Sequence, residues 1–165
     1  MIQIDKLDNE KKSVFLLALM ELIIDLLSPS EGYDIAKKSL NSCWEWVETK
    51  SISADELFFF LENVDENDVM SYMDMESDEI RVIVWQCLAA AMSYTIWCAY
   101  SYEKKEYMPE TIEGVDLETL LFFLDCFKQV YFKYEIAEEL FCSIQDEKSV
   151  TREVIVKHLK ECSKQ

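Results

Sequence analysis

The scarcity of glycine and proline constrains the fold of this chain more than any other feature of its sequence. The 165 residues include two glycines and two prolines, where average usage would give roughly twelve and eight. Sheets joined by tight hairpins need glycine at turn positions with positive φ, so the sequence disfavours them. Glycine-rich phosphate-binding loops of the Rossmann and Walker types are missing for the same reason. Since half of the residues are apolar, enough for a proper core, we expect an all-α protein.

Apolar residues at helical spacing, together with capping residues, predict where the helices lie. We expect one domain, residues 1–165, built as a bundle of about six or seven helices. The segment 78–103 is apolar on every side, which predicts the central helix of the bundle. The other predicted helices cover about 9–27, 29–48, 53–61, 116–131, 134–144 and a final segment from Thr151. The predicted N-terminal caps are Ser28, Ser53, Asp116 and Thr151, with a hydrophobic staple between Val150 and Ile155.

The net charge of −17 is far beyond the magnitude of about 2 to 8 that suits a small soluble domain. Nucleic acids and anionic bilayers bind to basic surfaces, so the charge disfavours both as partners. It favours a partner with a basic surface. A surface that is acidic only for solubility is the alternative interpretation.

Cysteine usage and the apolar runs indicate a cytoplasmic protein. Six cysteines occur without any CxxC pair, which predicts core thiols in a reducing compartment. The apolar run 14–27 contains Glu21 and Asp25, unlike a signal peptide. The longer run 80–102 contains Arg81 and Gln86, so we do not expect a membrane span.

A search for catalytic or metal-binding patterns gives little. The one histidine, His158, has Cys162 one helical turn away, but a structural zinc site needs four ligands. Asp65, Asn67 and Glu76 match three positions of a calcium-loop frame, but the frame has valine and methionine where an oxygen ligand and glycine are required. The adjacent acids Glu138 and Glu139 diverge by about 100° on a helix. We therefore expect no enzyme, no metal and no cofactor.

An acidic segment, residues 62–79, is the candidate binding surface because it contains no Lys or Arg and interleaves acids with Tyr and Met. Dense carboxylates with adaptable apolar groups suit recognition of a basic protein surface. Trp46 lies off the apolar stripe of its predicted helix, so we expect it to be exposed as an apolar anchor. A merely solvated loop is the alternative. The predicted partner-binding residues are Trp46, Glu62, Asp65, Glu66, Asp68, Tyr72, Met73, Asp74, Glu76, Asp78 and Glu79.

Several short motifs resemble a known family. The segments 43–48 (CWEWVE) and 90–97 (AAMSYTIW), the serine-capped acidic helix after the first of them, the loop 108–110 (MPE) and Val115-Asp116 are similar to the sixth immunity-protein family of bacterial polymorphic toxin systems. This resemblance, over about residues 35–126, implies an all-helical cytosolic protein that binds and neutralises a toxin domain made by the same bacterium. Such toxins are often nucleases with basic active clefts, which agrees with the charge of −17.

Two other functions stay open at the level of the sequence. One is a general acidic adaptor or regulatory module, and the other is an unrecognised enzyme or metal protein. The tryptophans provide a separate test of the fold, because we expect Trp85 and Trp97 to be buried on the central helix and Trp46 to be the more exposed.

Overall fold

The computed structural model describes residues 2–147 and 151–164, and within these residues it contains helices and no strand. The all-α prediction is confirmed. In chain order the elements are η1 (Ile4–Lys6), α1 (Asn9–Ile23), η2 (Ile24–Leu27), α2 (Tyr33–Thr49), α3 (Ala54–Leu61), α4 (Val69–Met75), α5 (Glu79–Glu103), α6 (Glu110–Glu113), α7 (Leu117–Val130), α8 (Glu135–Asp146) and α9 (Arg152–Ser163). The short helices α4 and α6 were not predicted.

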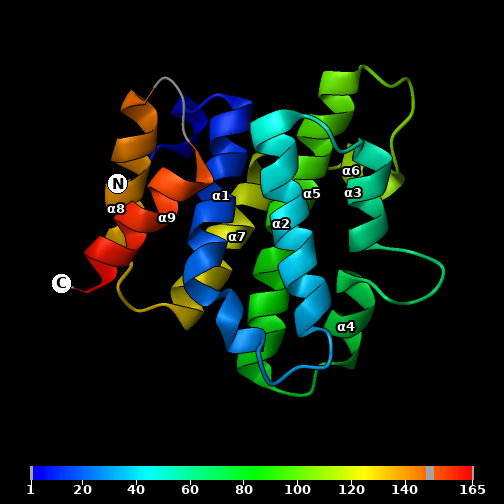
Figure 1. Ribbon diagram of the computed structural model, residues 1–165, viewed down its shortest axis with the longest axis horizontal. Helices are drawn as coiled ribbons and strands as arrows, with labels where there is room; N and C mark the ends of the chain where they lie inside the picture. The colour runs from blue at the N-terminus through cyan, green and yellow to red at the C-terminus, as the bar shows by residue number, and fades with distance from the viewer. Residues whose placement is uncertain (1, 148–150, 165) are drawn as a thin grey trace.

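Helix α5 is the centre of the bundle, as predicted. It contacts α1, α2, α3, α4 and α7, which surround it (Figure 1). Among the described helices α5 is long and apolar enough to cross a membrane, but 67% of its most apolar window is buried inside the protein. That is the pattern of a core helix in a soluble protein.

Helices α8 and α9 pack on α1, on the side of the molecule away from α3 and α4 (Figure 1). Arg152 joins the start of α9 to the helices α1 and α2 by hydrogen bonds. Its guanidinium donates to Glu21 on α1 at 2.8 Å, and its backbone N–H donates to Glu48 on α2 at the same distance. Trp44 also donates to Glu21, at 2.9 Å, so one carboxylate joins three helices.

Three of the four predicted caps are present. Ser53 accepts from the N–H of Glu56, Asp116 from that of Glu118 and Thr151 from that of Val154. Each satisfies a backbone N–H that the helix itself leaves without a partner. Residue Val150 lies outside the described residues, and so does its predicted staple with Ile155.

The predicted start of the second helix at Pro29, with Ser28 as its cap, is wrong. Helix α2 begins at Tyr33, and residues 28–32 form a turn. The Ser30 hydroxyl in this turn donates to Glu76, far along the chain. The ring of Tyr72 lies directly over Gly32, where any Cβ would come within 2.4 Å of it. The close packing of Tyr72 of α4 on this turn therefore requires glycine at position 32.

Four of the six cysteines are buried as free thiols, as predicted: Cys43, Cys87, Cys98 and Cys126. The prediction is wrong for Cys142, which is exposed on α8, and holds only in part for Cys162. Both lie on the outer helices α8 and α9, where fewer neighbours cover each face.

Candidate interaction surface

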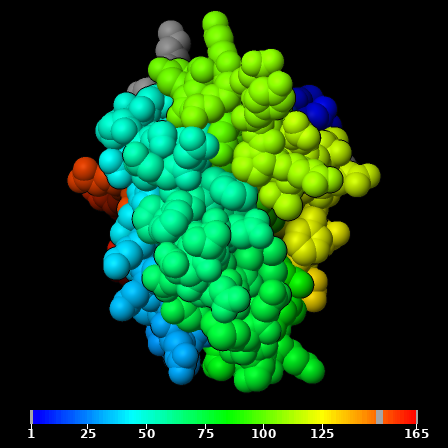
Figure 2. All heavy atoms as spheres, turned by 90° about the vertical axis from the view of Figure 1, so that its right-hand side faces the viewer, coloured from blue at the N-terminus to red at the C-terminus, as the bar shows by residue number. Residues whose placement is uncertain are grey.

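Two stretches of the chain hold almost all of its net charge. Residues 51–80 contain ten Asp and Glu, residues 106–127 contain six, and neither stretch contains Lys or Arg. The rest of the chain is therefore close to neutral. In the fold, the two stretches form α3, α4, α6 and α7, and they lie on one face of the molecule (Figure 2). We call this the acidic face.

Within the candidate segment, the acidic side chains that face solvent are Glu62, Asp65, Glu66, Asp74 and Glu79. The loop between α3 and α4 is ordered by Asn63. Its side-chain oxygen accepts from the N–H groups of Asp65 and Asn67, and its amide donates to the carbonyls of Phe59 and Asn67. These bonds fix the backbone of the loop that carries Asp65 and Glu66.

Asp68 is fully buried and is a helix cap. Its two oxygens accept from the backbone N–H of Ser71 at 2.7 Å and of Asn63 at 3.0 Å. The carboxylate therefore starts α4 and closes the preceding loop, and it does not face solvent. In the sequence, Asp68 is one acid in a run of acids, and nothing there distinguishes this buried cap from its exposed neighbours.

Glu76 is also turned inward, with its side chain 6% exposed. It pairs with Arg81 at 3.1 Å, and it accepts from Trp85 at 3.2 Å and from Ser30. Burial by itself raises the pKa of Glu76, but the hydrogen bonds from Ser30 and Arg81 outweigh it and lower the pKa to about 2.

Three further predicted residues lie at the edge of the core. Asp78 is partly buried and caps α5 by accepting from the N–H of Arg81 at 2.9 Å. Tyr72 is partly buried and stacks on Trp85 with ring centroids 6.1 Å apart. Met73 is partly buried on the same helix as Tyr72. The predicted segment is thus divided between residues that face solvent and residues that hold α4 in place.

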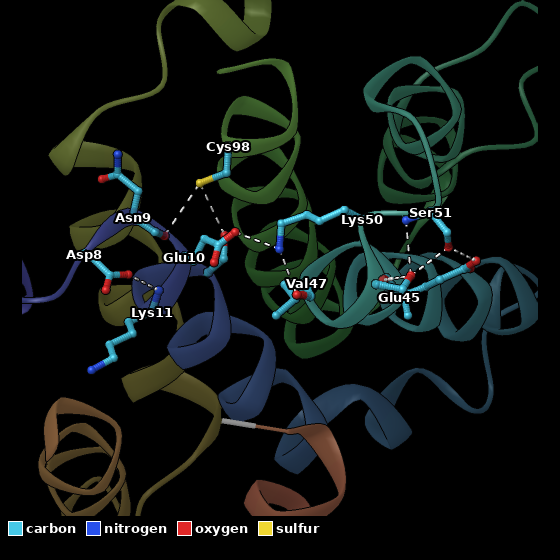
Figure 3. Close-up of polar contacts among 11 residues, drawn as sticks. Asp8, Asn9, Glu10, Lys11, Glu45, Val47, Lys50, Ser51 and Cys98 are labelled. Carbon is cyan, nitrogen blue, oxygen red and sulfur yellow. Dashed lines mark hydrogen bonds and ion pairs between the residues drawn. The ribbon is translucent and has the colours of Figure 1, made fainter. Parts of the chain in front are cut away.

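The predicted exposure of Trp46 is wrong, because its side chain is 1% exposed. Tyr102 packs edge-on against it, and the Lys50 ammonium lies 4.4 Å from its ring centroid. Figure 3 shows Lys50 reaching Glu10 on α1 and the carbonyl of Val47, at 2.7 and 2.9 Å. The apolar stripe of α2 predicts only one buried face of this helix. Trp46 lies on a second face, which Tyr102 at the C-terminal end of α5 covers. Trp85 is buried, as predicted. Trp97 was also expected to be buried, but it is partly exposed.

Apolar side chains that the sequence analysis missed are exposed on the acidic face. They are Phe59, Val64, Met75, Ile80, Leu117, Leu121 and Phe122. A signal was available in Phe58, Phe59 and Phe60, because three consecutive residues of a helix cannot all point to one side.

No group of three or more His, Cys, Asp or Glu could hold a metal ion in residues 2–147 and 151–164. The calcium-loop frame is not assembled, since Glu76 is held by Arg81. The His158 ring and the Cys162 thiol lie 3.6 Å apart on α9.

A search of curated proteins and a search of solved structures find no match to this chain. A family comparison does: the sequence model described as immunity protein Imm6 matches residues 11–130. The match covers α1 to α7, including both acidic stretches, and ends where α8 and α9 follow. The chain therefore belongs to the Imm6 family of immunity proteins.

Proposed function

We propose that this immunity protein neutralises a cognate toxin domain by covering a basic surface of that domain with its acidic face. The observation that carries the proposal is the charge distribution: the two stretches that form one face contain sixteen acids and no base, and all of these acids except Asp68, Glu76 and Asp78 are exposed. Such a face attracts and orients a basic partner and repels nucleic acid.

A nuclease is the target class that this face fits best. A nuclease must bind the phosphate backbone, and phosphate-binding surfaces are rich in Lys and Arg. A protein with a dense array of fixed carboxylates can occupy such a cleft in place of the nucleic acid. The chain then acts by binding and not by catalysis. Its action in the cytoplasm is supported by its free thiols, including the exposed Cys142.

The test begins with capture. Inactivated C-terminal domains of the polymorphic toxins encoded in the same genome are expressed one by one and passed over the immobilised protein. We expect one of them to bind and its enzymatic activity to be inhibited by the soluble protein. If none binds, or if binding leaves the toxin active, the proposed function is wrong.

The role of the acidic face is tested with a charge-matched pair of triple variants. Glu62→Gln, Asp65→Asn and Glu66→Gln remove three exposed charges from the face. Glu135→Gln, Asp146→Asn and Glu147→Gln remove three exposed charges at α8. We expect the first triple to slow association severalfold at low salt and to flatten its salt dependence, while the second changes the rate much less. Equal effects would show that net charge, and not this face, attracts the toxin.

A further inference from the structure

One strip along α5 is left partly exposed, although this helix is the centre of the core. Val82, Gln86, Ala89, Ser93 and Trp97 follow one another at steps of three and four residues, so they share one side of the helix. All five are partly exposed. The strip is about 22 Å long, at 1.5 Å per residue.

The neighbours of this strip follow from three contacts. On one side, Trp85 stacks on Tyr72 of α4, and Tyr100 donates to Asp55 of α3 at 2.6 Å. On the other side, the Cys126 thiol of α7 donates to Gln86 at 3.8 Å. The strip therefore lies between α3 and α4 on one flank and α7 on the other, and α6 also contacts α5. These are the helices that the two acidic stretches form.

Apolar side chains border the strip on both flanks. Phe59, one turn after Asp55 on α3, is 53% exposed, and Phe122, one turn before Cys126 on α7, is 48% exposed. Met73 on α4 lies one turn after the buried Val69 and is partly exposed. Aromatic and methionine side chains with small residues between them suit a surface that buries a partner's apolar side chains.

We propose that one basic amphipathic helix of the toxin domain docks lengthwise on this α5 strip, a proposal that rests on the proposed function. Ala89 and Ser93 at the middle of the strip let a helix approach closely, and helices pack with axes about 8 to 10 Å apart.

Charge complementarity sets the chemistry of this partner. The apolar side of the docked helix faces Trp97, Phe59 and Phe122, and its flanks face the acids of α3, α4 and α7, of which Asp55 already pairs with Lys105 at 2.8 Å. The exposed acids closest in sequence to the border are Asp55, Glu56, Glu62, Asp74, Glu118 and Asp125. A helix with Lys or Arg on both flanks of an apolar stripe fits this arrangement, and an acidic helix does not.

A synthetic peptide tests the strip independently of any toxin. The probe is a 20-residue amphipathic helix of Lys and Leu, and the control peptide has the same composition in scrambled order. Trp97 is the reporter, since Trp44, Trp46 and Trp85 are fully buried. We expect the amphipathic peptide to shift tryptophan emission, and we expect Trp97→Phe or Ala89→Glu to abolish the shift. An equal response to the scrambled peptide, or a response that survives Ala89→Glu, would overturn the proposal.

The captured toxin domain provides the second test. Ala89→Glu and Ser93→Glu place bulk on the strip while keeping the acidic sign, and Asn41→Glu makes the same change at an exposed position of α2. We expect the two strip variants to raise Kd at least tenfold through faster dissociation, and Asn41→Glu to stay within twofold of wild type. Thermal melts of each variant confirm that it is folded.

The outcomes separate the two proposals. A toxin domain that binds both strip variants as tightly as wild type overturns the docking site and leaves the proposed function intact. If the peptide responds at the strip and no toxin domain binds, the strip binds a basic amphipathic helix, but the toxin as the source of that helix and the proposed function are both overturned.

Discussion

Glu76 shows how one residue can belong to an acidic segment by sequence and to the core by structure. Its carboxylate joins Ser30 before α2, Arg81 and Trp85 on α5, and the end of α4. The run of acids does not indicate which groups Glu76 contacts. Ser30, for example, lies 46 residues away in the sequence. The sequence could predict the sign and density of charge in this segment, but not which carboxylates are engaged.

Glu76→Gln is expected to destabilise the protein by about 1 to 3 kcal/mol, since it removes a charged acceptor from three donors. Urea unfolding at neutral pH measures the loss. Glu79→Gln, an exposed acid of α5, is the control and should change stability by less than about 0.5 kcal/mol.

The same residue gives a pH dependence with a defined sign. The pKa of Glu76 falls from 4.5 to about 2 in the fold, so the unfolded chain binds the proton more tightly. The stabilisation by Glu76 is therefore fully present above about pH 4.5 and is lost as the pH falls toward 2. The difference in Tm between wild type and Glu76→Gln should shrink across that window. A constant difference would contradict this prediction.

Trp46, which the sequence suggested as an exposed anchor, is expected to contribute to stability, and Phe59 is expected to contribute to binding. Trp46→Ala removes a buried side chain and should cost about 3 to 5 kcal/mol, measured by denaturant unfolding. Phe59→Ala, at a half-exposed position, should cost far less stability and should instead speed dissociation of the toxin domain. A stable Trp46→Ala protein that fails to bind would reverse this assignment.

At the scale of the elements, helices with local signals were predictable and helices fixed by distant contacts were not. The caps Ser53, Asp116 and Thr151 bind N–H groups two or three residues away, so the sequence contains both partners. The start of α2 has no such local signal, because its N-cap is Gly32, without a side-chain cap, and the nearby Ser30 hydroxyl donates to Glu76. The short helix α4 is capped by Asp68, which from the sequence alone looks like one more acid on the surface.

Asp68→Ala is expected to unravel α4 and leave α5 intact. The variant loses both acceptors that close the loop and start the helix, at a cost of about 1 to 2 kcal/mol. Hydrogen exchange should become fast in residues 69–75 and stay slow in α5. Asp74→Ala, exposed on the same helix, is the control, and loss of protection in α5 as well would mean that α4 does not unfold separately.

At the scale of the whole molecule, the acidic face repels itself in the free protein. Salt screens repulsion between exposed charges over about 10 Å at 0.1 M. We therefore expect Tm to rise as NaCl is added up to about 0.5 M, while association with a basic partner slows under the same conditions. The triple variant of Glu62, Asp65 and Glu66 should show a smaller rise. A Tm that falls steadily with salt would mean that ion pairs such as Arg152 with Glu21 outweigh the repulsion.

The concentration of net charge on the acidic face, with a nearly neutral remainder and α9 on the far side, also makes the molecule an electric dipole. Helix α9 carries three basic side chains against two acidic ones, Arg152, Lys157 and Lys160 against Glu153 and Glu161, and Lys164 follows it directly. In the field of a cationic partner, a dipole feels a torque as well as an attraction, so the molecule rotates while it is still diffusing. It then arrives with α3, α4 and α7 in front and α9 behind, and a larger share of collisions begins in the binding orientation.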